Sequence, residues 1–347
     1  MKLIDANTYV IFGGTGFIGI HFTRYLLELG KTKDIFLVDI KPPTLDEFPD
    51  LIKHAIRNGN VQFVKSDVRK PINASELPTQ ADIIINLAAI HREPGHEPRE
   101  YFETNILGAE NVCNWAEKVK CNTIVFTSSI SPYGPSEKPK TEKSLPEPLT
   151  PYGSSKLIAE KIHQLWQKGD SARKLLIVRP GVVFGPGEGG NVTRLVKAVL
   201  GRYFIYMGNK NKIKAGGYVK ELCHSIDWML SFMEEKKRNF LLYNFSLNPP
   251  PTVEDYVSTI CEVAGVKRRF PSLPYPLLNF AAFLMSAFLK PFNISHPFSP
   301  VRIKKLVRSN NIIPEFLIQN GYQFHYTLKE AQEDWKKEKP SDWGLRN

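Results

Sequence analysis

The chain has 347 residues, a net charge of +11 at pH 7 and a hydrophobic fraction of 42%. These values predict a globular protein with one large and one smaller domain, and they exclude a chain too short or too polar to bury a core. The positive charge favours phosphate-bearing ligands, but no nucleic-acid-binding module accompanies it, so we expect no nucleic acid partner.

The N-terminus enters a predicted strand within a few residues, which leaves no room for a signal peptide. The four cysteines, Cys113, Cys121, Cys223 and Cys261, lack the paired spacing of a metal site. We therefore expect a cytoplasmic protein that binds no metal.

Short β-branched runs alternate with amphipathic helical patterns over the first half of the chain. Helices are predicted over 21–29, 108–119 and 154–168, and a returning strand over 239–246. This order predicts an α/β fold with a Rossmann-type, doubly wound parallel sheet. Its other strands are predicted over 10–12, 35–39, 61–64, 83–87, 123–127 and 175–179.

Three glycines at three-residue spacing, Gly13, Gly16 and Gly19, directly follow the first predicted strand. At such a position the first glycine permits a sharp turn and the second lets backbone N–H groups approach a pyrophosphate. The third lets the helix pack tightly. The stretch therefore predicts a dinucleotide-binding turn.

Asp39 ends the second predicted strand about twenty residues after Gly19, where an acidic side chain accepts hydrogen bonds from an adenosine ribose. A 2′-phosphate would bring negative charge against this carboxylate, so the sequence favours NAD over NADP, with Lys41 leaving some tolerance for NADP. Asp67, at the end of the third strand, is a candidate contact for the adenine edge; a capping aspartate is the alternative.

Tyr152 and Lys156 are one helical turn apart and therefore lie on one face of a helix predicted to begin near Ser154. An ammonium so placed lowers the pKa of a phenol, which makes the phenolate a useful base near neutral pH. Ser129, at the end of a strand, is placed to bind the same substrate oxygen. Together these residues predict hydride-transfer chemistry at an alcohol.

The chain resembles the extended short-chain dehydrogenase/reductase superfamily over nearly its whole length. Within it, the chain is most similar to the NAD-dependent epimerase/dehydratase group that acts on nucleotide-linked sugars, especially members found among polysaccharide-synthesis enzymes. The resemblance implies Ser129, Tyr152 and Lys156 as catalytic residues, and a homodimer formed through a pair of helices. The motifs that carry it are GGTGFIG (13–19), Asp39, Asp67, NLAA (86–89), Asn105, TSS (127–129) with a following YG, YGSSK (152–156) and RPG (179–181).

The expected ligand contacts lie in the glycine turn and at the ends of the later strands. For the cofactor they are Gly13, Thr15, Gly16, Phe17, Ile18, Gly19, Asp39, Asp67, Val68, Leu87, Ala88, Ala89, Asn105, Tyr152, Lys156, Arg179 and Pro180. For the substrate they are His91, Ser129, Ser131, Asn191 and Lys214. A loop histidine without catalytic duty is the alternative for His91.

Absent residues restrict the reaction. Sugar dehydratases of this group place an aspartate and a glutamate after the active-site Ser or Thr, whereas this chain has Ile130 and Ser131. Elimination then lacks its acid and base, so we favour chemistry at one carbinol carbon. An epimerase of nucleotide-diphosphate sugars is the leading prediction. A 4-keto reductase, a hydroxysteroid-type dehydrogenase and a catalytically silent NAD-sensing protein are the alternatives.

The substrate side departs from the best-known sugar epimerases. Those carry an asparagine two or three residues after the late-strand arginine, but Arg179 is followed by PGVV (180–183). Asn191, after the glycine-rich stretch 185–190, is a substitute phosphate contact, with a plain surface loop as the alternative. Lys214 occupies the region of a substrate-facing basic residue in relatives, and Lys220 and Glu221 replace an acidic pair there.

The predicted domains are a NAD-binding unit over 1–180 and 208–248 and a smaller, mostly C-terminal α/β substrate unit over 181–207 and 249–347. The longest apolar run, 277–289, is shorter than the roughly 20 residues that span a bilayer. We predict a buried helix there; an interfacial anchor aided by Arg302, Lys304, Lys305 and Arg308 is the alternative.

Overall fold

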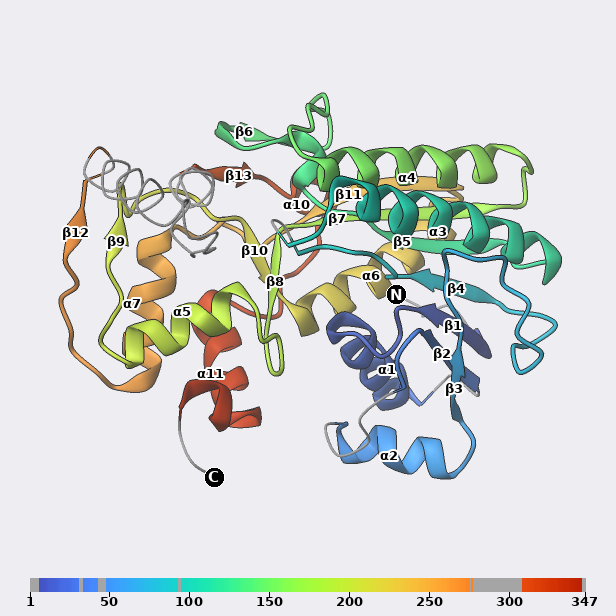
Figure 1. Cartoon of the computed structure of the whole chain (residues 1–347), viewed down its shortest axis with the longest axis horizontal. Helices are drawn as coiled ribbons and strands as arrows, with labels where there is room; N and C mark the ends of the chain where they lie inside the picture. Colours follow the sequence, from blue (N-terminus) through green and yellow to red (C-terminus); the bar gives the residue numbers. More distant parts are fainter. Residues whose placement is uncertain are drawn as a thin grey trace, which may run out of the picture.

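A seven-stranded sheet forms the centre of the computed structural model, which describes residues 6–30, 34–42, 48–92, 95–274, 276 and 308–344 (Figure 1). All its strand pairs are parallel, and the order is β11-β7-β5-β4-β1-β2-β3. The predicted doubly wound sheet and its returning strand are confirmed. The strands are β1 (Thr8–Phe12), β2 (Asp34–Asp39), β3 (Val61–Lys65), β4 (Ile83–Asn86), β5 (Thr123–Thr127), β7 (Lys174–Pro180) and β11 (Phe240–Phe245).

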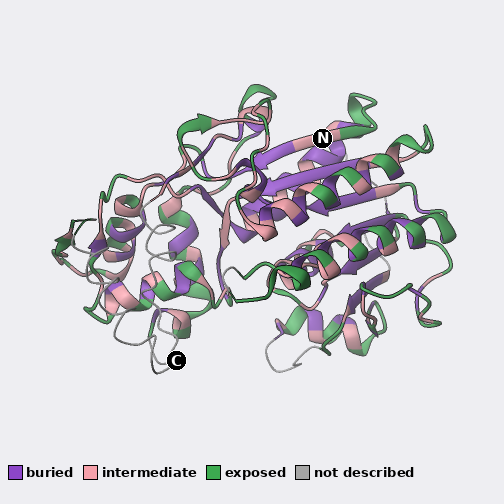
Figure 2. Ribbon diagram, turned by 45° about the horizontal axis from the view of Figure 1, so that its top comes forward, coloured by how far each residue is buried: buried purple, intermediate pink, exposed green. Residues whose placement is uncertain are grey.

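Helices cover both faces of the sheet, and the strands between them are almost wholly buried (Figure 2). One face packs against α3 (Pro98–Lys118) and α4 (Pro151–Lys168), and the other against α1 (Phe17–Leu29), α2 (Asp50–Arg57) and α6 (Val219–Glu235). Three helices begin earlier than predicted, at 17, 98 and 151 rather than 21, 108 and 154. Their first turns contain glycine, proline and charged residues, which interrupt the apolar period on which the prediction depended.

The smaller lobe has its own apolar core, built from side chains of both its middle and its C-terminal segments. It includes helix α7 (Val253–Ala264), and two short parallel pairs accompany it, β8–β10 and β9–β12. The lobe's other elements are β8 (Val182–Phe184), α5 (Asn191–Leu200), β9 (Tyr206–Met207), β10 (Gly216–Tyr218), β12 (Ser272–Leu273), α11 (Leu328–Glu338) and the 3-10 helix η4 (Pro340–Trp343).

The C-terminal segment also returns to the large sheet. Helix α10 (Glu315–Gln319) places Leu317 in the core beneath α1 and α6, and Tyr322 joins the same core. Strand β13 (Asn310–Ile312) pairs with β6 (Ser136–Lys140), which follows the short 3-10 helix η2 (Ser131–Tyr133). The predicted apolar helix over 277–289 and most of the basic stretch before Arg308 lie outside the described residues. Within the described residues, no helix is long and apolar enough to cross a membrane.

A buried ion pair fastens α4 to the sheet. The guanidinium of Arg179 on β7 donates from Nε and from a terminal nitrogen to the two carboxylate oxygens of Glu160, at 2.8 and 2.6 Å. Both side chains are almost fully buried, and Arg179 also stacks 4.6 Å from the ring of Tyr133. The protein interior does not solvate either charge as water would. Removing one partner therefore leaves the other as an unpaired buried charge.

Glu160→Gln tests this attachment, because it leaves a buried guanidinium without its counter-charge. We expect a loss of about 3–5 kcal/mol in the free energy of unfolding, measured by chemical denaturation. The matched control is Glu262→Gln, whose carboxylate pairs with Lys329 at 2.6 Å on the surface and whose loss should cost about 1 kcal/mol or less. Equal losses in the two variants would contradict the proposed role of the buried pair.

Candidate active site

The glycine turn lies where β1 meets the backbone that leaves β4. Gly13 has φ +76, and a Cβ on it would lie 2.9 Å from the amide nitrogen of Ala88. A Cβ on Gly19 would lie 2.5 Å from the carbonyl oxygen of Gly14. Gly13 thus permits the sharp turn and the close approach of Ala88, whereas Gly19 lets α1 pack on the turn itself rather than on the sheet.

The N-terminus of α1 faces outward without a side-chain cap. Its N-cap residue, Gly16, is exposed, and its first turn contains no acidic residue. Unpaired N–H groups and the positive end of the helix dipole are therefore available for an anion. These features fit a dinucleotide pyrophosphate, whose oxygens take N–H donors at such a position.

Asp39 lies beside this turn, because the amide groups of Gly13 and Gly14 both donate to the carbonyl of the preceding residue, Val38, at 2.8 and 3.3 Å. Asp67 is engaged locally: its carboxylate accepts two hydrogen bonds from Arg69 Nε at 3.0 Å and a third from a terminal guanidinium nitrogen at 2.7 Å. These bonds to Arg69 hold the pKa of Asp67 below its usual range. The adenine contact of Asp67 stays a prediction.

Asn105 on α3 joins two loops of the site. Its side-chain oxygen accepts from the Ile90 amide at 2.9 Å, and its nitrogen donates to the Ser155 hydroxyl at 2.9 Å. Ser155 in turn donates to the carbonyl of Tyr152 at 2.9 Å. Asn105 therefore fixes the segment after β4 and the first turn of α4 relative to each other.

Lys156 reaches from α4 to the end of β5. Its ammonium donates to the Thr127 carbonyl at 2.7 Å and lies 4.3 Å from the ring centre of Phe126. Complete burial lowers the pKa of Lys156 to about 7, against the opposing effect of Glu160. The ammonium is therefore held at the backbone of Thr127, two residues before Ser129 in the chain. Burial makes it lose its proton more easily than an exposed lysine does.

Tyr152 occupies the first turn of α4, which packs on the loop after β5. A Cβ on the neighbouring Gly153 would lie 2.7 Å from the Ser131 carbonyl, so this contact requires a glycine. The Ser129 hydroxyl donates to Ser131 Oγ and accepts from the Ser131 amide, each at 3.1 Å. The structure thus brings the segments that carry Ser129, Tyr152 and Lys156 together at the carboxyl end of β5.

The segment after β4 borders the same place. The Tyr152 ring lies 6.1 Å from that of Tyr101, whose hydroxyl donates to the Arg92 carbonyl. Burial lowers the pKa of His91, and the positive charges of Arg92 and Lys156 lower it further. Both effects favour the neutral form of the His91 imidazole at pH 7.

Three predicted ligand contacts have other partners. The Arg179 side chain is buried against Glu160, and the Lys214 ammonium donates to the Arg308 carbonyl. Asn191 is exposed and accepts a bond from Arg194 at 2.7 Å. Glu188 also covers the N-terminus of α5, where it accepts from the Thr193 amide at 2.9 Å. A carboxylate there disfavours a bound phosphate, so the predicted Asn191 contact is not supported.

The remaining predicted contacts line the turn or its supports. Leu87 donates its amide to the Phe12 carbonyl at 2.9 Å, Pro180 accepts from the Ile130 amide at 3.1 Å, and the Val68 carbonyl accepts from Asn111 at 2.8 Å. Thr15 donates its hydroxyl to the Lys41 carbonyl at 3.3 Å. Their contacts with a cofactor stay predictions.

Sequence reasoning missed Glu160 and Ser128, which support the site from beneath. The Ser128 hydroxyl donates to the carboxylate of Glu160 that also holds Arg179. Two signals pointed to this arrangement: an arginine ends an otherwise apolar strand, and Glu160 is one helical turn beyond Lys156. A buried arginine needs a carboxylate, and α4 is the adjacent element that supplies one.

Comparisons with known proteins identify similar sequences and structures. A family model described as the NAD dependent epimerase/dehydratase family matches residues 9–243. The N-acetyl-alpha-D-glucosaminyl-diphospho-ditrans,octacis-undecaprenol 4-epimerase of Escherichia coli O157:H7 is 28% identical over 268 residues, 76% of this chain and 80% of that protein. A sterol-4-alpha-carboxylate 3-dehydrogenase of Saccharomyces cerevisiae is 25% identical over 223 residues, 61% of each chain.

Among solved structures, a UDP-glucuronic acid 4-epimerase from Bacillus cereus in complex with NAD has a TM-score of 0.70 at 21% identity. The match covers 95% of this chain and 99% of that one. This likeness shows a shared fold.

Lys156→Met tests the burial of the amine. Because the folded-state pKa lies below the unfolded one, folding of the wild type releases protons between about pH 7 and pH 10, so its stability should rise with pH in that window. The variant should lack this rise and melt at least about 2 °C higher at pH 7. Thermal unfolding at pH 7 and pH 9 provides the measurement. Lys161→Met, an exposed change on the same helix, is the control; identical behaviour of the two variants would contradict the inference.

Proposed function

Because this chain belongs to the NAD dependent epimerase/dehydratase family, we propose that it is an NAD-dependent epimerase that inverts one carbinol carbon of a diphosphate-linked sugar. The observation that carries the proposal is the convergence of Ser129, Tyr152 and Lys156 beside the glycine turn. The segments that bear them meet at the carboxyl end of the sheet. There the chain continues from β1 to β2 on one side and from β4 to β5 on the other side of the sheet.

The side chains divide the work of moving one proton. The phenolate of Tyr152 takes the proton of the sugar hydroxyl and becomes the phenol, and the Ser129 hydroxyl hydrogen-bonds the same oxygen to hold it in place. In its protonated form, Lys156, one helical turn beyond Tyr152, supplies positive charge that favours the phenolate. NAD held at the glycine turn would supply the hydride acceptor and donor that inversion of the sugar carbon needs.

The loop after Ser129 supports epimerisation over water loss. Ile130 is buried, and Ser131 is hydrogen-bonded to Ser129. Neither residue provides the acid and base that elimination needs. A net reductase would use the same residues but consume the cofactor, and a hydroxysteroid-type dehydrogenase, as the sterol-acting relative suggests, would take an apolar alcohol.

A lipid-diphosphate-linked sugar is a second substrate candidate. The Escherichia coli relative is named for a sugar carried on undecaprenyl diphosphate. This chain has Gly181 and Val182 where the best-known nucleotide-sugar epimerases carry an asparagine for the nucleotide diphosphate. Both substrate classes are precursors of polysaccharides, and both present a sugar attached to a diphosphate.

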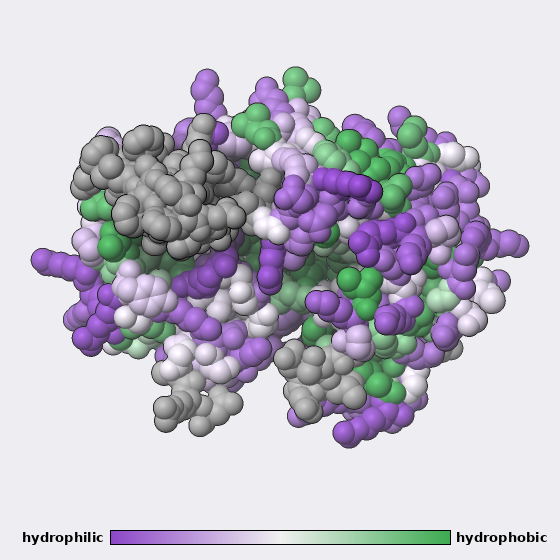
Figure 3. Space-filling view, in the orientation of Figure 1, coloured by the Kyte–Doolittle hydropathy of each residue, from purple (hydrophilic) through white to green (hydrophobic). Residues whose placement is uncertain are grey.

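We further propose a homodimer formed through α3 and α4. These helices lie side by side on one face of the sheet and leave four large apolar side chains at least partly exposed: Phe102, Leu107, Ile158 and Leu165. Figure 3 shows apolar side chains, in green, over this region of the surface. Covering them with a second copy removes apolar area from water.

Epimerase activity is tested with UDP-N-acetylglucosamine and with its undecaprenyl-diphosphate-linked counterpart. We expect the C4 epimer to form from one of them without net NADH production, and Tyr152→Phe to reduce kcat by about 10²-fold or more. Product analysis by chromatography with NADH absorbance distinguishes the outcomes. Turnover that consumes NADH stoichiometrically would indicate a reductase instead, and full activity of Tyr152→Phe would refute the assigned base.

Cofactor preference is tested by titrating the cofactor-free protein with NAD and NADP. The carboxylate of Asp39 next to the glycine turn should repel a 2′-phosphate, so we expect NAD to bind at least about tenfold more tightly. Asp39→Ser should narrow this ratio, with Asp34→Ser, at the opposite end of the same strand, as the control. Tighter binding of NADP to the wild type would overturn the preference.

A further inference from the structure

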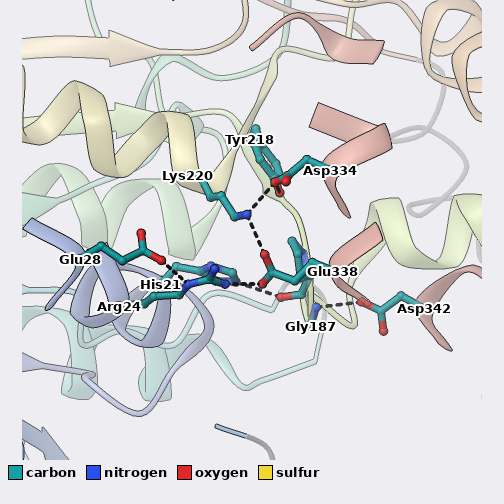
Figure 4. Close-up of polar contacts among 10 residues, drawn as sticks. His21, Arg24, Glu28, Gly187, Tyr218, Lys220, Asp334, Glu338 and Asp342 are labelled. Atoms are coloured by element: carbon teal, nitrogen blue, oxygen red, sulfur yellow. Dashed lines mark hydrogen bonds and ion pairs between the residues drawn. The ribbon is translucent and has the colours of Figure 1, made fainter. Parts of the chain in front are cut away.

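Lys220 and Glu221, at the start of α6, both bind the C-terminal part of the chain. The ammonium of Lys220 donates to Asp334 and Glu338 of α11, each at 2.6 Å (Figure 4). The buried carboxylate of Glu221 accepts from the backbone N–H groups of His325 and Tyr326 at 2.8 and 2.9 Å. The pair that departs from the relatives' acidic pattern therefore anchors residues 322–338.

Helix α11 also binds the helix that begins at the glycine turn. One carboxylate oxygen of Glu338 forms an ion pair with a terminal guanidinium nitrogen of Arg24 on α1 at 2.8 Å. The other oxygen pairs with the ammonium of Lys220 (Figure 4). Burial lowers the pKa of Lys220, but its bonds to Asp334 and Glu338 outweigh this effect and leave the pKa raised. Lys220 is therefore charged at neutral pH, and Glu338 joins α6 to α1.

The loop over residues 185–190 is held from both sides by the same elements. His21 on α1 meets the Pro186 carbonyl at 2.9 Å, and because burial lowers the pKa of His21, the neutral ring donates from Nε2. On the other side, Asp342 accepts from the Gly187 amide at 2.8 Å (Figure 4). It also accepts from the indole N–H of Trp335 at 2.9 Å.

This loop reaches the active site through β8, which follows β7 almost directly. The carbonyl of Pro180, at the end of β7, accepts from the Ile130 amide one residue beyond Ser129. A shift of the loop therefore displaces the chain that borders the catalytic residues. The loop also leads into α5, whose first turn begins the smaller lobe's helical layer.

We propose that residues 322–343 act as a C-terminal brace that positions the 185–190 loop for substrate binding, and that Lys220 is the positioning residue on which the brace depends. The brace ties the smaller lobe to α1, the helix whose N-terminus fits the cofactor. Two cations, Lys220 and Arg24, balance two carboxylates, Asp334 and Glu338, across three helices. Removing Lys220 leaves Glu338 paired with Arg24 and Asp334 bonded to the Tyr218 hydroxyl, so α11 loses both ion pairs to α6 and holds the loop less firmly.

The statement that the loop serves substrate binding rests on the proposed epimerase function, whereas the mechanical coupling does not. Two readouts separate them: hydrogen exchange of the 185–190 amides in the NAD-loaded protein, and steady-state kinetics with the sugar substrate. Lys220→Met should raise exchange in the loop about tenfold and raise the substrate KM about tenfold, with kcat within about twofold. Lys220→Arg should restore both values.

The matched control is Lys329→Met, which removes a lysine of α11 whose ammonium pairs with Glu262 of α7 at 2.6 Å. It should change neither readout. Glu338→Gln provides a milder break of the same network if Lys220→Met folds poorly, and should shift both readouts in the same direction. Unchanged loop exchange in both variants, or exchange that rises equally across the sheet, would overturn the brace. If the loop exchange changes as expected but the protein turns over no sugar, the proposed function is wrong and the brace is not contradicted.

Discussion

Burial of the Lys156 amine at the end of β5 is the constraint on which the site depends. The amine belongs to α4 and donates to the Thr127 carbonyl at the end of β5. A movement of the helix would therefore break this hydrogen bond or expose the buried amine. The same helix carries Tyr152 in its first turn and Glu160 one turn beyond Lys156. Position of the base, support of the lysine and attachment to β7 are therefore properties of a single helix.

Charges in this protein serve two different purposes according to their burial. Glu160 and Arg179 lie in the interior, where each needs the other and where their exchange for polar neutral groups is costly. The network of Arg24, Lys220, Asp334 and Glu338 is partly exposed, so each of its bonds is individually weaker and adjustable. The first kind fixes the catalytic residues to the sheet. The second kind joins α11 to α1 and α6.

The reaction follows from what surrounds the alcohol rather than from the fold alone. The family's fold accommodates epimerases, dehydratases and dehydrogenases, and the selection among them depends on the residues after Ser129. Here a buried isoleucine and a hydrogen-bonded serine occupy those positions. Neither residue offers a second proton-transfer group, which fits the proposed chemistry at a single carbinol carbon.

The sequence by itself determined the parallel sheet, the glycine turn, Asp39 beside it and the Ser129, Tyr152 and Lys156 set. These features are local: strand periodicity, glycine spacing and helical spacing are all read within about twenty residues. Only the tertiary structure decided the partners of Arg179, Lys214 and Asn191, and the roles of Lys220 and Glu221. The partners of Lys214, Lys220 and Glu221 lie 94, 114 and 104 residues away along the chain, and which side chain a buried or bridging charge meets depends on the packing of elements that local patterns do not specify.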